Sequence, residues 1–108
     1  MMDKTIEGVE KLADEELKMA NEQHPLFASN HEGAAVILEE VEEAALELEV
    51  LKIGYKLLWG EVKSDDPIGV KRYVGKMRKR AIRCAAECIQ VAAMCEKMML
   101  SKEKFDEK

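Results

Sequence analysis

Residues 36–57 read VILEEVEEAALELEVLKIGYKL, and one face of this stretch decides the fold. Taken in alternating steps of three and four, that face consists of Val36, Glu39, Glu43, Leu46, Val50, Ile53 and Leu57. This spacing is typical of one face of an α-helix. Its apolar members predict a partner helix, whereas the two carboxylates would be costly to bury without positive charge beside them. A divalent cation bound by carboxylate oxygens would supply that charge.

Composition supports a helical reading of the whole chain. The 108 residues are 47% hydrophobic and 36% charged, with aromatic residues at only 5%, which favours an all-α bundle over a β-sandwich. The length predicts a single helical domain over residues 1–108. A net charge of −5 disfavours a nucleic-acid partner. The sequence offers neither a bilayer-spanning apolar run nor a signal-peptide core, so we expect a cytoplasmic protein with no membrane partner.

Two breaks divide the chain into three expected helices. The first helix should cover residues 3–21 and end before Pro25, which cannot continue it. Ser29 and Glu32 have the spacing of a capping box, which predicts a second helix over residues 30–59 with Gly60 near its C-terminal cap. Asp66 is the expected N-cap of the third helix, with Pro67 as its first residue.

The third helix is expected to have apolar side chains around most of its circumference. Because Gly69 and Gly75 weaken its beginning, we expect ordered helix nearer Arg72 or Lys76. Three helices of this kind have more apolar surface than one small chain can cover. We therefore expect a symmetric homo-oligomer, a homodimer or homotetramer, whose long helices form a four-helix core.

Acidic side chains from two helices form the candidate site. Glu39, Glu40 and Glu43 lie on neighbouring turns of the second helix, and Glu87 lies in the narrow polar strip of the third helix. Arg80 and Arg83 precede Glu87 in that strip. The spacing alone leaves three alternatives: a Mg²⁺ site, a salt-bridge ladder of Glu39 and Glu43 against the two arginines, or a solvated acidic face. The arginines are candidates for phosphate contacts or for structural pairing.

The order of these motifs resembles a known family. Glu39-Glu40-x-x-Glu43 followed by Glu87-x-x-Gln90 is similar to the Glu-Glu-x-x-Glu … Glu-x-x-Asp signature of the MazG-like all-α nucleoside triphosphate pyrophosphohydrolases. Residues 25–27, 31–43 and 86–94 resemble segments of small phage- or prophage-encoded members, and the resemblance covers roughly residues 5–100.

The resemblance implies a MazG-like helical dimer or tetramer. It implies Mg²⁺, with Mn²⁺ as the alternative ion, and hydrolysis of a nucleoside triphosphate to the monophosphate and pyrophosphate. By motif matching, Glu39, Glu40, Glu43 and Glu87 would be the catalytic metal ligands, with Gln90 as a further ligand. Arg80 and Arg83 would contact the nucleotide phosphates.

One position departs from the signature, because Gln90 stands where the family has Asp. An amide oxygen can coordinate a metal ion but cannot neutralise it. The alternative prediction is therefore a catalytically weakened or inactive MazG-like module for oligomerisation or nucleotide binding.

Overall fold

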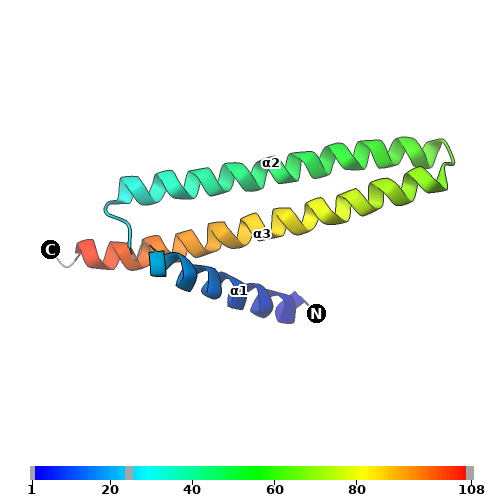
Figure 1. Cartoon of the computed structure of the whole chain (residues 1–108). Coiled ribbons are helices and arrows are strands. Elements are labelled where there is room, and N and C mark those ends of the chain that lie inside the picture. The colour runs from blue at the N-terminus through cyan, green and yellow to red at the C-terminus, as the bar shows by residue number, and fades with distance from the viewer. Residues whose placement is uncertain (1, 24–25, 107–108) are drawn as a thin grey trace. The chain divides into compact units, whose positions relative to one another are not determined.

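The computed structural model describes residues 2–23 and 26–106, with the backbone alone for residues 102–106. Within those residues the chain forms three helices and no strand: α1 (Met2–Gln23), α2 (Asn30–Lys63) and α3 (Pro67–Asp106) (Figure 1). The predicted all-α class with two long helices is confirmed. The expected break at Pro25 lies outside the described residues. Among the helices described, none combines the length and the apolar character that crossing a membrane requires.

The two ends of α2 are held by hydrogen bonds. At its start the hydroxyl of Ser29 accepts a hydrogen bond from the backbone N–H of Glu32 at 3.1 Å, as the capping-box spacing predicts. The expected end near Gly60 is wrong, because α2 continues to Lys63. Asp65 has a φ of 52°, and its N–H donates to the carbonyl of Val62 at 3.2 Å. This left-handed residue ends the helix in place of a glycine.

The start of α3 confirms the cap and corrects the expected position of ordered helix. A carboxylate oxygen of Asp66 accepts hydrogen bonds from the N–H groups of Ile68 at 3.2 Å and Gly69 at 3.1 Å. The Gly69 hydrogen bond is the main reason that the pKa of Asp66 lies below its ordinary value. Because this cap satisfies the first backbone donors, α3 begins at Pro67 and not near Arg72 or Lys76.

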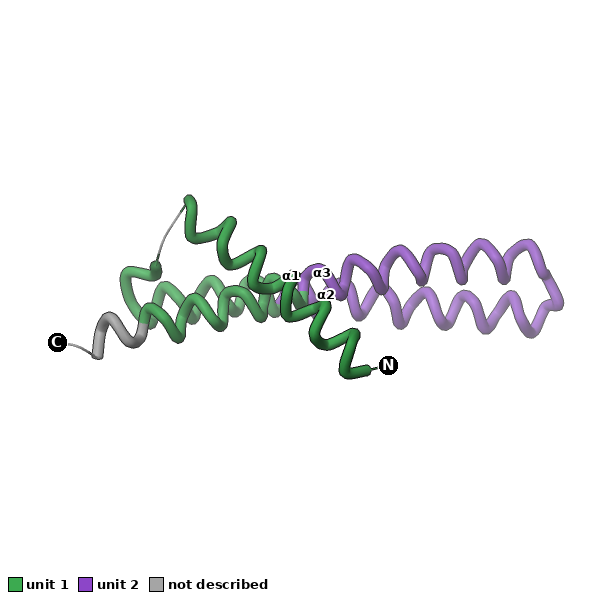
Figure 2. Tube along the Cα trace, turned by 90° about the horizontal axis from the view of Figure 1, so that it is seen from below, with its two compact units in different colours: residues 1–41, 88–108 green, residues 42–87 purple. Residues whose placement is uncertain are grey.

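The chain divides into two compact units, which Figure 2 colours separately. Unit 1 comprises Met1–Val41 and Cys88–Lys108, and it contains the buried apolar core. The buried members of that core are Phe27, Ala93 and Met94, and the partly buried side chains packed against them are Leu17, Ala20, Val36, Ile37 and Met98. The loop before α2 is anchored to α3 because the N–H of Phe27 donates to the hydroxyl of Ser101 at 3.0 Å.

Unit 2 comprises Glu42–Glu87, where α2 and α3 run side by side in opposite directions (Figures 1 and 2). Among its residues the structure describes no buried apolar side chain. Leu46, Ile53 and Leu57, which share the face that opens the sequence argument, are 64%, 49% and 48% exposed. Apolar side chains of unit 2 are therefore exposed to a degree that is typical of interaction surfaces. Both long helices belong to both units, and the single domain over residues 1–108 stays a prediction.

Candidate metal centre

Glu43 of α2 and Glu87 of α3 face each other in unit 2. Each offers a carboxylate oxygen within 4.8 Å of one on the other. Burial raises the pKa of Glu87 above its ordinary value, and a hydrogen bond with Glu43 and the negative charges of Glu43 and Glu47 raise it further, while the charge of Arg83 acts in the opposite direction. The two helices thus bring together two carboxylates that repel each other when both are ionised.

The other predicted ligands occupy neighbouring turns of the same two helices. Glu40 lies one turn before Glu43 on α2 and belongs to unit 1. Glu39, which is exposed, also belongs to unit 1. Gln90 is half-buried, one turn after Glu87 on α3. Within unit 2 the predicted site is therefore represented by Glu43 and Glu87, while Glu39, Glu40 and Gln90 belong to unit 1.

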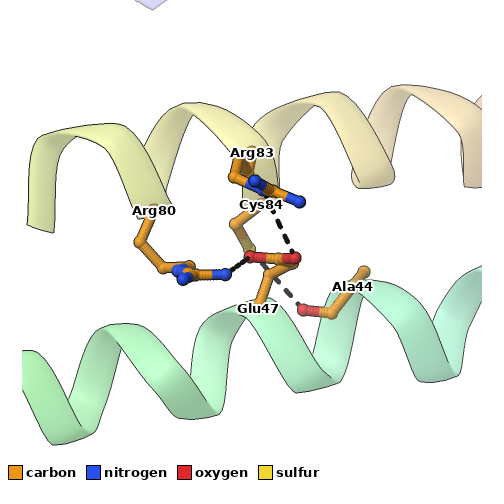
Figure 3. Close-up of polar contacts among 5 residues, drawn as sticks. All are labelled: Ala44, Glu47, Arg80, Arg83 and Cys84. Carbon is orange, nitrogen blue, oxygen red and sulfur yellow. Dashed lines mark hydrogen bonds and ion pairs between the residues drawn. The ribbon is translucent and has the colours of Figure 1, made fainter. Parts of the chain in front are cut away.

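Glu47 is the acidic partner of both arginines (Figure 3). The guanidinium Nη1 of Arg80 lies 2.9 Å from one carboxylate oxygen, and Nε of Arg83 lies 3.6 Å from the other. The Glu47 side chain is 13% exposed, compared with 36% for Arg80 and 68% for Arg83. The salt-bridge alternative thus expected the wrong acidic residues: the recorded partner is Glu47, one turn beyond Glu43.

This ion pair separates two kinds of carboxylate on α2. Glu47 is neutralised by positive charge from its own chain, so its oxygens are already engaged. Neither Glu43 nor Glu87 forms an ion pair among the described residues, and the pKa of Glu87 is raised first by burial and then by the hydrogen bond and charge of Glu43. Mg²⁺ prefers oxygen ligands and is usually held by few carboxylates, with water and phosphate completing its shell. The chemistry of the donor set fits such an ion.

The cysteines do not add soft ligands to this centre. The thiol of Cys84 donates to the backbone carbonyl of Ala44 at 3.7 Å (Figure 3), a contact that links α3 to α2. Cys84, Cys88 and Cys95 form no disulfide. Cys84 is half-buried and contributes to helix packing beside the site, whereas Cys88 and Cys95 are exposed, which is contrary to the usual burial of free cysteines.

Comparison with known proteins adds no family to this geometry. No protein-family model, no curated protein and no solved structure matches this chain.

Proposed function

We propose that this chain is a Mg²⁺-dependent nucleoside triphosphate pyrophosphohydrolase of the MazG-like type, which converts a nucleoside triphosphate to the monophosphate and pyrophosphate in the cytoplasm. The observation that carries the proposal is the convergence of Glu43 and Glu87 from two helices, with oxygens within 4.8 Å and a raised pKa at Glu87. A divalent cation would let both carboxylates ionise together. Control of the cellular nucleotide pool is the role that this reaction would serve.

The residues divide into metal ligands and phosphate contacts. Glu40, Glu43 and Glu87 would hold Mg²⁺ or Mn²⁺, with Glu39 and Gln90 supplying further oxygens from adjacent turns. When bound, the ion would lower the pKa of a coordinated water and offset negative charge on the phosphate oxygens, so that water could attack the α-phosphorus. Arg83, which is 68% exposed and 3.6 Å from Glu47, is better placed than Arg80 to turn toward a phosphate.

The proposed enzyme is a homodimer or homotetramer with a four-helix core. The support for this assembly is the absence of a buried apolar side chain among the described residues of unit 2. Pairing two such hairpins would cover exposed apolar side chains of unit 2 and give each copy the core that it lacks.

Pyrophosphate release from a panel of ordinary and modified nucleoside triphosphates tests the enzyme directly. With millimolar Mg²⁺, we expect turnover of at least one substrate, reduced roughly 10²-fold or more by Glu43→Gln or Glu87→Gln. Glu49→Gln is the matched control, because Glu49 is exposed on the same helix and outside the carboxylate group. Lack of release from every triphosphate would exclude the enzyme.

A second candidate is a MazG-like helical module for oligomerisation or nucleotide binding that has lost some or all of the chemistry. Two observations favour it: Gln90 is neutral, and Glu47 already engages Arg80 and Arg83. Calorimetric titration with Mg²⁺ and Mn²⁺ separates the candidates. Metal binding together with faster turnover in Gln90→Asp would identify Gln90 as a weakened ligand. No metal binding, with higher stability in the Glu39→Leu/Glu43→Leu double variant, would assign the acidic residues to structure.

A further inference from the structure

The N-terminal half of α1 has an apolar face that is partly exposed among the residues the structure describes. Farther along α1, Leu17 and Ala20 pack against the core of unit 1. On the same face Ile6 and Val9 are 47% and 41% exposed, and α1 has no buried residue. Met2, Ile6 and Val9 follow the spacing with which a helix anchors itself in an apolar groove. This half of α1 therefore leaves apolar side chains exposed at regular helical spacing.

An acidic row runs beside that face. Glu7, Glu10 and Asp14 follow one another at intervals of three and four residues, and all three are exposed. The helix as a whole carries seven acidic side chains against three lysines. Glu10 and Asp14 share a surface hollow with Glu96 of α3, and no basic residue lines that hollow among the residues described. The row therefore presents negative charge at the surface of α1.

Unit 2 has a groove between α2 and α3 that is lined by apolar and basic side chains. Val50, Ile53 and Leu57 line it from α2. Lys76, Lys79 and Arg83 are among the α3 residues that line it. None of the described lining residues is acidic.

The groove matches α1 in both chemistry and spacing. Lys76 and Lys79 are three residues apart, as are Glu7 and Glu10, whereas Arg83 already lies 3.6 Å from Glu47 of its own chain. Lys79 makes no ion pair with any described residue, and Ile53 and Leu57 are about half exposed, at 49% and 48%. A helix with an apolar stripe beside an acidic row can place the stripe on the α2 wall and the row against the α3 cations.

We propose that α1 of one copy docks in the groove of unit 2 of a second copy, and that the exchange is reciprocal. A two-fold dimer built in this way forms the contact twice, each copy giving one helix and receiving one. It would cover the exposed apolar side chains of α1 and of the groove together, and it would pair the two charged rows. This contact specifies which surfaces meet in the homo-oligomer proposed above. Its test measures the mass of the assembly, so loss or absence of pyrophosphohydrolase activity does not affect the outcome.

Charge reversal on each side, followed by mixing, tests the contact with the full chain. We expect Lys76→Glu/Lys79→Glu and Glu7→Lys/Glu10→Lys each to weaken dimerisation about tenfold or more in sedimentation equilibrium. An equimolar mixture of the two variants should regain the dimer, because each acidic groove then meets a basic helix. All four side chains are exposed, and circular dichroism would verify that both variants keep their helix content.

The matched control is Lys52→Glu/Lys56→Glu, which makes the same charge change on exposed residues of unit 2 that do not line the groove. We expect this variant to dimerise like the wild type. A monomeric wild type, dimers that survive either reversal, or dissociation of the control to the same extent would each overturn the proposal. Recovery only when both reversals are in one chain, with none on mixing, would also overturn it, because that result places the contact within a single copy.

Discussion

Ser101 is a single side chain that joins the loop before α2 to α3. Its side chain is 1% exposed; its hydroxyl accepts from the N–H of Phe27 at 3.0 Å and donates to the carbonyl of Lys97 at 2.9 Å. Ser101→Ala would leave the Phe27 N–H buried without an acceptor, so we expect the free energy of unfolding to fall by about 1–3 kcal/mol. Urea denaturation measures this change.

Ser64→Ala is the matched control for that variant, because the Ser64 hydroxyl also donates to a carbonyl four residues earlier but is exposed. We expect it to change stability by less than about 0.5 kcal/mol. Equal losses in the two variants would show that the Phe27 hydrogen bond does not hold the loop.

Asp65 is the one described residue other than glycine with a positive φ, at 52°. Left-handed backbone costs an L-residue of this kind roughly 1 kcal/mol, and glycine adopts it without that penalty. Asp65→Gly should therefore raise the free energy of unfolding by up to about 1 kcal/mol, and Asp65→Ala should lower it. A thermal denaturation series of the three side chains at this position would show the order Gly, Asp, Ala, and a reversed order would contradict the assigned turn.

At the scale of helices, the sequence predicts where α2 and α3 begin better than where α2 ends. Ser29 and Asp66 mark the two starts because a side-chain oxygen can satisfy the first backbone donors of a helix. Gly60 suggested an end that is wrong, since a glycine ends a helix only where the chain turns left-handed, and here Asp65 makes that turn. Local sequence did not distinguish the two positions.

The ion pair was assigned to the wrong carboxylates because spacing within each helix does not fix which residues of the two helices stand opposite each other. In an antiparallel hairpin, the position of the turn decides which residues of the two helices stand opposite each other. Here Arg80 meets Glu47, one turn beyond Glu43. The convergence of Glu43 and Glu87 could be predicted from the helical face within residues 36–57 and from the family resemblance. The pairing of Glu47 with Arg80 could not.

The Glu47 cluster predicts unequal contributions from its two arginines. Arg80→Met would remove the 2.9 Å contact and leave the largely buried Glu47 carboxylate with only the longer contact to Arg83, so we expect a loss of about 1–3 kcal/mol. Arg83→Met removes an exposed, longer contact and should cost less than about 1 kcal/mol. Urea denaturation of both variants in low salt checks the order. Equal losses would mean that the 2.9 Å contact contributes no more than the exposed one.

At the scale of the whole molecule, composition and periodicity predicted three helices but not how the core would be distributed. Apolar positions are frequent throughout α2 and α3, yet the buried apolar side chains that the structure describes lie in unit 1, around Phe27, Ala93 and Met94. Hydrophobic periodicity shows that a face needs covering, and it cannot say whether the same chain or another copy covers it. Under the proposed assembly, another copy covers the exposed Leu46 and Ile53.

Stability of the whole chain should depend on pH through Glu87. Its pKa in the folded protein lies above its ordinary value of 4.5, chiefly because of burial and then because of the hydrogen bond and charge of Glu43. The folded state therefore holds the proton more tightly than the unfolded state. This contribution to the free energy of unfolding is fully present below pH 4.5 and is lost as the pH rises through the raised pKa of the folded protein.

Glu87→Gln should remove that decline, because the amide does not ionise and can still donate a hydrogen bond to Glu43. Urea denaturation from pH 4 upward in metal-free buffer would show the difference, with Glu49→Gln retaining the wild-type slope. Added Mg²⁺ should restore stability to the wild type at neutral pH and do so less in Glu87→Gln, since a cation that binds the ionised pair stabilises only the folded state. An identical pH profile in the wild type and in Glu87→Gln would mean that the two carboxylates do not oppose each other in solution, and the proposed metal centre would lose its main support.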